Sequence, residues 1–342
     1  MEKYILQNDY SEGIHPSLLQ ALNSANSIQT DSYNEDRYSI AAAEAIRKNL
    51  NKDADIHFCS GGTQANIIAI SSMLKSFESV IAPKSGHIAV HEAGAIEATG
   101  HKINTVETND GKLRPENVKT VLDIHTDEHM VKPRLVFISN TTEIGTIYTK
   151  KELTELSDFC KKNELLLYLD GARLASALTS HANDLSLSDL AILVDMFYIG
   201  GTKNGALLGE AIVINNNNLK RNFRYHLKQK GALLAKGRVL GIQFLELFKD
   251  DLFYNLGRHA NEMAYKLSEG IEASDYSFLT EPVSNQIFPI LPNNIIEKLR
   301  SEFQFYTWKK VDNNLSAVRL VTSWATKIKT ISKFISLLNE TD

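Results

Sequence analysis

The stretch LLLYLDGARLA, residues 165–175, decides the fold, because a continuous apolar run gives way to an aspartate, a glycine and a helical pattern. A parallel sheet is covered on both faces, so its strands are apolar throughout instead of alternating with polar residues. Asp170 stands at the carboxyl end of the run, and ligands of open α/β sheets bind beyond that end. The stretch therefore predicts a buried parallel strand that delivers a carboxylate to a ligand-binding edge.

The same succession of apolar run and helical pattern recurs along the first 245 residues. It is seen in DIHFC then TQANIIAISSMLKSF, SVIAP then VHEAGAIEA, RLVFIS then KKELTELSDFCKKN, and AIVI then LKRNFRYHLKQ. Such alternation is typical of an α/β domain with a largely parallel sheet. From residue 246 the pattern changes to a long helix, short strands and a final helix. We therefore expect a large α/β domain over 1–245, which includes the N-terminal segment, and a smaller C-terminal α+β domain over 246–342.

The composition is that of a soluble globular protein, with 342 residues, 43% hydrophobic and 23% charged, and a formal net charge of −4. This charge does not favour a nucleic-acid partner, and no apolar run approaches the roughly 20 residues that span a bilayer. Cys59 and Cys160 form no C-x-x-C motif, and MEKYILQNDY lacks the basic and apolar regions of a secretory signal. We therefore expect a cytoplasmic protein with no nucleic-acid or membrane partner.

Asp170 has both a structural and a chemical interpretation. It would cap the helix that follows, or form a buried ion pair with Arg173. Alternatively, its carboxylate would stabilise the protonated nitrogen of a pyridine ring. The residue types alone leave both interpretations open.

A second strand ending, YIGGTKNGAL at 198–207, carries Lys203. Desolvation at such a position lowers the pKa of an amine and makes it more nucleophilic, as Schiff-base chemistry requires. A lysine after a strand more often extends to the surface or binds phosphate. Here Gly200, Gly201 and Gly205 leave room for a flat ligand to approach.

The third element is CSGGTQANIIAI, residues 59–70, where a strand gives way to a glycine-rich turn and a helix. The free N–H groups and positive dipole end of such a helix bind anions. The stretch matches neither G-x-x-x-x-G-K-[ST] nor G-x-G-x-x-G, which argues against a nucleotide-dependent enzyme. A phosphate site, an aspartate and a lysine are together the anchors that pyridoxal 5′-phosphate requires, and they predict this cofactor.

The motifs SGGTQAN, HIAVHEAGAIE, YLDGARLASAL, GGTKNGAL and VRLVTSW resemble, in this order, those of the threonine aldolase family. The resemblance covers nearly the whole chain and implies the aspartate aminotransferase-like fold of type I pyridoxal phosphate enzymes. It implies that Lys203 holds the cofactor as an internal aldimine, that Asp170 pairs with the ring nitrogen, and that His87 stacks on the ring. The residues implied to bind the cofactor are Ser60, Gly62, Thr63, His87, Asp170, Arg173, Lys203 and Arg238.

The resemblance also implies a substrate site and a subunit interface. Arg319 would clamp the substrate carboxylate, for which the planar guanidinium is suited. Arg238 resembles an arginine that reaches the phosphate of a neighbouring subunit, and Tyr33 a tyrosine donated across the same interface, so a homodimer or homotetramer with shared active sites is expected. The N-terminal Ser-Asp of the family is Asn8-Asp9 in this chain. The residues implied to bind the substrate are Asn8, Tyr33, Arg173 and Arg319.

The reaction that the resemblance implies is aldol cleavage of L-threonine, L-allo-threonine or a related β-hydroxy-α-amino acid such as phenylserine. The products would be glycine and an aldehyde, formed through a quinonoid intermediate. A β-eliminating lyase or an aminotransferase shares the same anchors and remains an alternative. A non-catalytic, phosphate-binding protein also remains one, because fold alone does not imply function.

The proton acceptor is where this sequence departs from many relatives. SNTTEIGT, residues 139–146, has Thr142 where they have a histidine, and it resembles a subgroup with Thr-Glu-x-Gly at this place. Threonine is no base at neutral pH, so we predict that His87, acting through water, is catalytic together with Lys203 and Asp170. Glu92 is a further candidate site residue. A zinc site would need His87 and His91 on one helix face beside Glu92, and we expect no metal.

Overall fold

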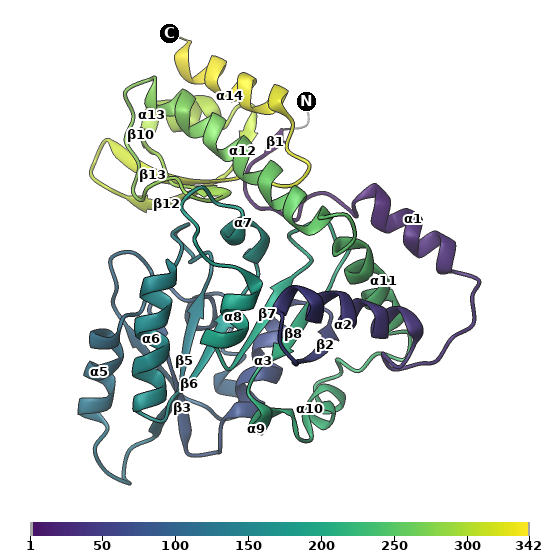
Figure 1. Cartoon of the computed structure of the whole chain (residues 1–342). Coiled ribbons are helices and arrows are strands. Elements are labelled where there is room, and N and C mark those ends of the chain that lie inside the picture. The colour runs from purple at the N-terminus through teal and green to yellow at the C-terminus, as the bar shows by residue number, and fades with distance from the viewer. Residues whose placement is uncertain (1–2, 341–342) are drawn as a thin grey trace.

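The computed structural model describes residues 3–340 and, within them, a seven-stranded sheet covered by helices on both faces (Figure 1). The spatial order of its strands is β2-β8-β7-β6-β5-β3-β4, and β8 is antiparallel to both neighbours, while the remaining pairs are parallel. The predicted α/β fold with a mostly parallel sheet is confirmed. The strands are β2 Asp55–Cys59, β3 Glu78–Pro83, β4 Ile103–Val106, β5 Lys132–Ser139, β6 Leu166–Asp170, β7 Met196–Gly200 and β8 Glu210–Ile214.

Successive residues of each strand enter two different cores, because side chains alternate between the faces of a sheet. In β6, Leu167 and Leu169 belong to one hydrophobic cluster and Leu166 and Tyr168 to the other. The first cluster is covered by α2 Arg37–Leu50, α5 Pro115–Ile124, α6 Lys150–Lys162, α7 Leu174–Leu178, α8 Leu187–Leu193 and α11 Arg238–Leu247. The second is covered by α3 Gly62–Met73, α4 His87–Val90 and α10 Phe223–Gln229. Coverage on both faces explains why the strands are apolar throughout.

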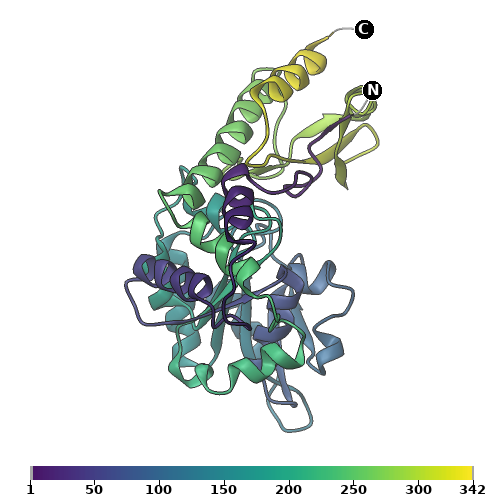
Figure 2. The ribbon, with the colours of Figure 1, turned by 90° about the vertical axis from the view of Figure 1, so that its right-hand side faces the viewer.

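The C-terminal part of the chain forms a third core above the carboxyl edge of the large sheet (Figure 2). Here β13 pairs with β10, β12 and β9, all antiparallel, and α12 and α14 pack together. β1 near the N-terminus pairs with β11, and Leu6 lies in this core, so the start of the described chain packs on the C-terminal part. The elements are β1 Tyr4–Ile5, α12 Leu252–Glu272, β9 Gln286–Ile287, β10 Ile290–Pro292, α13 Asn293–Leu299, β11 Phe303–Gln304, β12 Tyr306–Lys310, β13 Leu315–Val321 and α14 Ile328–Asn339.

The helix predicted over 90–98 is absent, and this expectation is wrong. The regular helix α4 ends at Val90, and a short 3₁₀ turn, η1, covers only Glu97–Thr99. Ala93 and Gly94 between them have φ angles of +51° and +75°, a left-handed conformation that a right-handed helix cannot contain. The segment therefore folds as a series of turns over the edge of the sheet.

Further helices lie around the large sheet. α1 Pro16–Ala25 packs against α11, on the outer side of the molecule (Figure 1). α9 Asn217–Lys220 and α10 replace the single helix that the pattern suggested over 219–229. None of the helices within residues 3–340 combines the length and the apolar character that crossing a bilayer requires.

Candidate active site

A cavity of about 680 Å³ lies at the carboxyl edge of the large sheet, between that edge and strands β12 and β13. Its walls carry residues from both parts of the chain, including Glu143 and Glu210 from the large part and Tyr306 from the C-terminal part. Most of the residues assigned to a site from the sequence line this one cavity, namely Ser60, Gly62, Thr63, His87, Asp170, Arg173, Lys203 and Arg319.

Asp170 lies at the end of β6 and is held by three donors. Its Oδ1 accepts hydrogen bonds from the Tyr198 hydroxyl at 2.6 Å and the Ala172 amide at 3.0 Å, and its Oδ2 accepts one from Asn66 at 3.1 Å. The Asn66 amide is itself oriented by the Tyr168 hydroxyl, which donates to Oδ1 at 3.0 Å. The network fixes the carboxylate at the cavity wall, and the ion pair with Arg173 that the sequence left open is not formed by Asp170.

Lys203 is partly buried, and its amine makes no hydrogen bond with the residues that the structure describes. Burial lowers the pKa of this amine, and the charge of the neighbouring Arg173 adds to the effect. The backbone before the lysine is pinned by Glu210, whose carboxylate accepts from the Gly201 amide at 2.9 Å and the Thr202 hydroxyl at 2.8 Å. Burial in turn raises the pKa of Glu210 to about 7. The amine is thus left free to react.

The N-terminus of α3 opens into the cavity without a side-chain cap. The N-cap residue is Gly61, which has no side chain to accept hydrogen bonds from the first turn. The N–H groups of that turn are therefore left for a ligand. A Cβ added at Gly62 would lie 3.0 Å from the Tyr198 hydroxyl oxygen, which explains the need for a small residue. Ser60 is engaged locally, because its hydroxyl donates to the Gln64 side chain at 2.8 Å.

His87 begins α4 and is anchored by a buried carboxylate. Its Nδ1 lies 2.8 Å from Glu92 Oε1, and the same oxygen accepts from Asn66 at 2.7 Å. Burial alone would lower the pKa of His87, but the hydrogen bond with Glu92 and the charges of Glu143 and Asp170 together outweigh burial, and the pKa is raised. Glu92 therefore acts behind the histidine and does not line the cavity.

Two arginines from different parts of the chain line the opposite wall. Arg173 forms a buried two-point ion pair with Asp9, at 2.7 Å from Nε to Oδ2 and 3.1 Å from Nη2 to Oδ1. Arg319 on β13 donates from Nη2 to the Gln7 carbonyl at 3.2 Å, whereas its buried Nε has no partner among residues 3–340. The Arg319 guanidinium lies over the ring of Trp308, 5.6 Å from the ring centroid. An unpaired, buried N–H of this kind is suited to an anionic ligand.

Besides Glu92, three of the predicted site residues lie outside the cavity of their own chain. Asn8 accepts hydrogen bonds from the Tyr10 amide and the Ser11 hydroxyl, both at 2.9 Å. Tyr33 is 40% exposed. Arg238, at the start of α11, donates to the carbonyls of Ile28 and Asn26. Their predicted roles stay predictions.

Sequence reasoning missed three carboxylates that the fold brings to the site. Asp9 reaches it through the N-terminal segment, and no local pattern marks that approach. Glu210 opens β8, and because β8 runs antiparallel its first residue lies at the same edge as the last residue of β6. Glu143 lies in the loop after β5, and the sequence does not show which residue of that loop turns inward.

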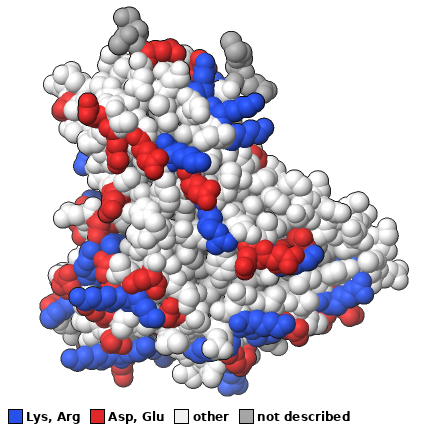
Figure 3. All heavy atoms as spheres, turned by 45° about the horizontal axis from the view of Figure 1, so that its top comes forward, with Lys and Arg blue, Asp and Glu red and all other residues white. Residues whose placement is uncertain are grey.

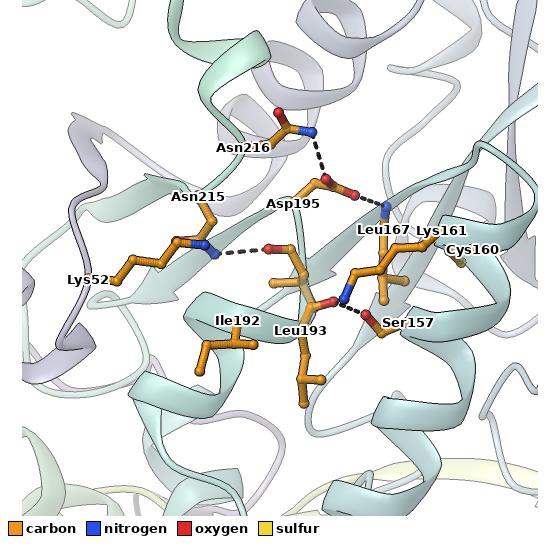
Figure 4. Close-up of a pocket in the computed structure, with 11 residues that line it drawn as sticks. Lys52, Ser157, Cys160, Lys161, Leu167, Ile192, Leu193, Asp195, Asn215 and Asn216 are labelled. Carbon is orange, nitrogen blue, oxygen red and sulfur yellow. Dashed lines mark hydrogen bonds between the residues drawn. The ribbon is translucent and has the colours of Figure 1, made fainter.

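A second, smaller hollow of about 190 Å³ lies at the opposite edge of the sheet (Figure 4). Its polar groups bond to one another. Asp195 accepts from the Leu167 amide and the Asn216 side chain, each at 2.8 Å, and Ser157 donates to the Leu193 carbonyl at 2.5 Å. These contacts hold the strand ends to the helices, and the hollow offers little to a ligand.

Comparison with known proteins gives consistent results. Residues 9–292 match the family described as beta-eliminating lyase. Two low specificity L-threonine aldolases, from Pseudomonas aeruginosa and a Pseudomonas species, are 32% and 33% identical to this chain over 95% and 94% of its length and 94% and 92% of theirs. The solved structure of a Leishmania major threonine aldolase is 50% identical, covers 98% of both chains and has a TM-score of 0.97. A Thermus thermophilus aspartate aminotransferase, 14% identical with a TM-score of 0.74, shares the fold.

Proposed function

We propose that this chain, which belongs to the beta-eliminating lyase family, cleaves the Cα–Cβ bond of a β-hydroxy-α-amino acid such as L-threonine and releases glycine and an aldehyde. The enzyme is a lyase that depends on pyridoxal phosphate. L-Threonine is the first substrate to test, because the curated relatives that match most of the chain bear that name.

The residues around the cavity fit pyridoxal phosphate. The uncapped first turn of α3 offers N–H groups to a phosphate, Asp170 offers a carboxylate to a ring nitrogen, and Lys203 offers a free amine for covalent attachment. Gly62 leaves the space beside Tyr198 that a side chain would fill. A cavity of about 680 Å³ accommodates a cofactor and a small amino acid together.

The observation that carries the proposal is that Arg319, whose Nε has no partner among the described residues, lines the same cavity as Lys203, whose amine makes no hydrogen bond with them. An amino acid brings a carboxylate, which a guanidinium binds in two-point geometry, and an amine, which competes with Lys203 for the cofactor. The bound cofactor supplies an electron sink for the pair of electrons left on Cα. Arg319 thus orients the substrate, and Lys203 and Asp170 hold the group that accepts its electrons.

The side chains also exclude alternative orientations of the substrate. Arg319 packs against the rings of Tyr306 and Trp308 in β12, at 5.5 and 5.6 Å from their centroids. These rings restrict the guanidinium and line the cavity with apolar surface. An apolar wall beside the carboxylate site leaves room for a methyl or a larger substituent at the β-carbon.

We further propose that the enzyme acts as a homodimer or larger homo-oligomer whose subunits share active sites. Tyr33 and Arg238 lie outside the cavity of their own chain, as residues donated to a neighbour would. α1 contains no charged residue, Leu19 on it is 55% exposed, and the surface over it is largely uncharged in Figure 3. Sedimentation equilibrium tests this arrangement, and a monomer at micromolar concentration that is fully active would contradict it.

The reaction is tested by incubating the pyridoxal phosphate-loaded enzyme with L-threonine, L-allo-threonine and phenylserine in parallel. We expect glycine and the matching aldehyde in equal amounts from at least one of them. Release of 2-oxobutanoate from threonine instead would indicate β-elimination, and formation of pyridoxamine phosphate would indicate transamination. Either result without glycine would contradict the proposal.

A further inference from the structure

Glu143 has the position of an unused acid or base in the cavity. The residue is 7% exposed and lines the cavity wall. Its carboxylate makes no hydrogen bond with any other residue that the structure describes. Its oxygens are not among the fully buried side-chain atoms that lack a partner, so the carboxylate is open to the cavity and to a substrate bound there.

The loop that carries Glu143 explains why residue 143, and not residue 142, faces the cavity. The Thr142 hydroxyl is turned into the loop, where it lies 2.8 Å from the Thr146 hydroxyl and accepts from the Thr146 amide at 3.2 Å. Gln286 donates to the Thr142 carbonyl at 3.2 Å and fixes the backbone. Thr142 does not line the cavity. Position 142, where many relatives are expected to carry a histidine, therefore does not line the cavity in this chain.

Cationic side chains surround Glu143 in the cavity. Each of them interacts electrostatically with its carboxylate. An ionised carboxylate is a proton acceptor, and inside a cavity it is a more effective one than water. The groups concerned are His87, His91, Arg173, Lys203 and Arg319.

We propose that Glu143 is the catalytic base that accepts the proton of the substrate's β-hydroxyl group. In this step the O–H bond breaks, its electron pair forms the second bond of the aldehyde carbonyl, and the Cα–Cβ electron pair remains on Cα. A proton then adds to Cα and completes glycine, so one proton is taken and one is returned. The inference deepens the proposed function and rests on it.

This assignment gives His87 a different role from the one predicted from the sequence. Its Nδ1 is occupied by Glu92 at 2.8 Å. Since its pKa is raised, a smaller fraction of the imidazole is neutral and able to accept a proton at a given pH. The carboxylate of Glu143, in contrast, makes no hydrogen bond with another described residue. His87 remains suited to stacking on the cofactor and to holding positive charge beside it.

The test compares Glu143→Gln, Glu143→Asp and the exposed control Glu262→Gln with the wild-type holoenzyme. We expect Glu143→Gln to lower kcat for threonine cleavage by about 10²–10⁴-fold, the usual contribution of a general base, with KM within threefold. Glu143→Asp should recover part of the lost kcat. The control Glu262→Gln should keep the wild-type kcat. Cofactor absorbance and glycine affinity from spectral titration should stay within threefold of wild type.

Exchange of the glycine α-proton in D₂O separates a loss of the base for the β-hydroxyl from a general loss of cofactor chemistry, because glycine has no β-hydroxyl. Glu143→Gln should exchange it within threefold of the wild-type rate. Cleavage by Glu143→Gln within threefold of wild type overturns the inference, and so does an equal loss of exchange and cleavage. A wild-type enzyme that exchanges glycine but cleaves none of the three β-hydroxy amino acids overturns the proposed function, and the inference falls with it.

Discussion

Arg319 illustrates how a single side chain is prepared for a ligand. Its Nε is buried without a partner among the described residues, and burial lowers the pKa of its guanidinium from the ordinary value. An arginine keeps its charge in proteins. Such a group is stabilised only when an anion arrives. Gln7, in the N-terminal segment, has a backbone carbonyl that accepts from Nη2 at 3.2 Å. This contact fixes the plane of the guanidinium for that anion.

Replacing Arg319 by alanine should therefore weaken substrate binding selectively. We expect KM for L-threonine to rise by about 10–100-fold, since a hydrogen bond to a charged group contributes about 1.5–3 kcal/mol. Cofactor absorbance should not change, because no assigned cofactor contact is lost. Steady-state kinetics on Arg319→Ala, with the exposed Arg258→Ala as control, measures this. An unchanged KM would show that the carboxylate binds elsewhere.

At this scale the sequence was informative where a residue ends a parallel strand. Asp170 and Lys203 were identified because an apolar run leads directly to each of them. Asp9, Glu143 and Glu210 were not, although all three lie at the same site. Asp9 arrives by tertiary packing of the N-terminal segment, Glu210 depends on the reversed direction of β8, and Glu143 depends on which of two loop residues turns inward.

The loop 139–146 is the element on which the placement of Glu143 depends. It is held from both ends, because the Thr142 amide donates to the Thr146 carbonyl at 2.9 Å and Ser284 donates to the Gly145 carbonyl at 2.8 Å. Gly145 has a φ angle of +79°, and a Cβ there would lie 2.5 Å from the Gln286 carbonyl oxygen. The loop and β9 are therefore fitted together with no room for a side chain.

Gly145→Ala should destabilise the protein more than a glycine change of the same backbone conformation elsewhere. Gly231 is the matched control, because its φ is +72° and no atom lies within 4 Å of an added Cβ. Each alanine costs about 1–2 kcal/mol for the left-handed conformation, and only Gly145→Ala adds the clash. Urea unfolding should give a lower midpoint for Gly145→Ala, with reduced kcat. Equal midpoints for the two variants would contradict this account of the loop.

Element types were easier to predict than element ends. The apolar strands of the large sheet and the long helix α12 follow from periodicity, which depends on residues close in sequence. The expected helix over 90–98 failed because Ala93 and Gly94 adopt positive φ angles. Only the glycine among them gave a warning, and the turn is stabilised by what lies beneath it, including the contact between His87 and Glu92.

At the scale of the whole molecule, the N-terminal segment joins the two parts of the chain. β1 pairs with β11, and a few residues later Asp9 pairs with Arg173, which follows β6. Asn285 donates to the same carboxylate at 3.0 Å. Burial alone would raise the pKa of Asp9, but Arg173, Lys203 and Asn285 together outweigh burial and hold that pKa below its ordinary value of 3.8.

Asp9→Asn should destabilise the protein in a pH-dependent way. Removing one partner of a buried ion pair costs about 3–5 kcal/mol. Because the folded-state pKa of Asp9 is lowered, its contribution is complete above pH 3.8 and is lost as the pH falls through the folded-state value. The difference in urea midpoint from wild type should be large at pH 7 and shrink below pH 3.8, with the exposed Asp31→Asn as control. A difference that does not change with pH would show that the charge of Asp9 is not what matters.

The central claim is that Lys203, in the turn after β7, carries the cofactor in the cavity where the substrate is cleaved. The most direct measurement is borohydride reduction of the holoenzyme followed by peptide mass mapping. The account predicts pyridoxyl modification on Lys203. It also predicts that the Lys203→Ala variant folds, carries no such modification and releases no glycine from L-threonine. Modification of another lysine, or glycine release by Lys203→Ala at the wild-type rate, would contradict it.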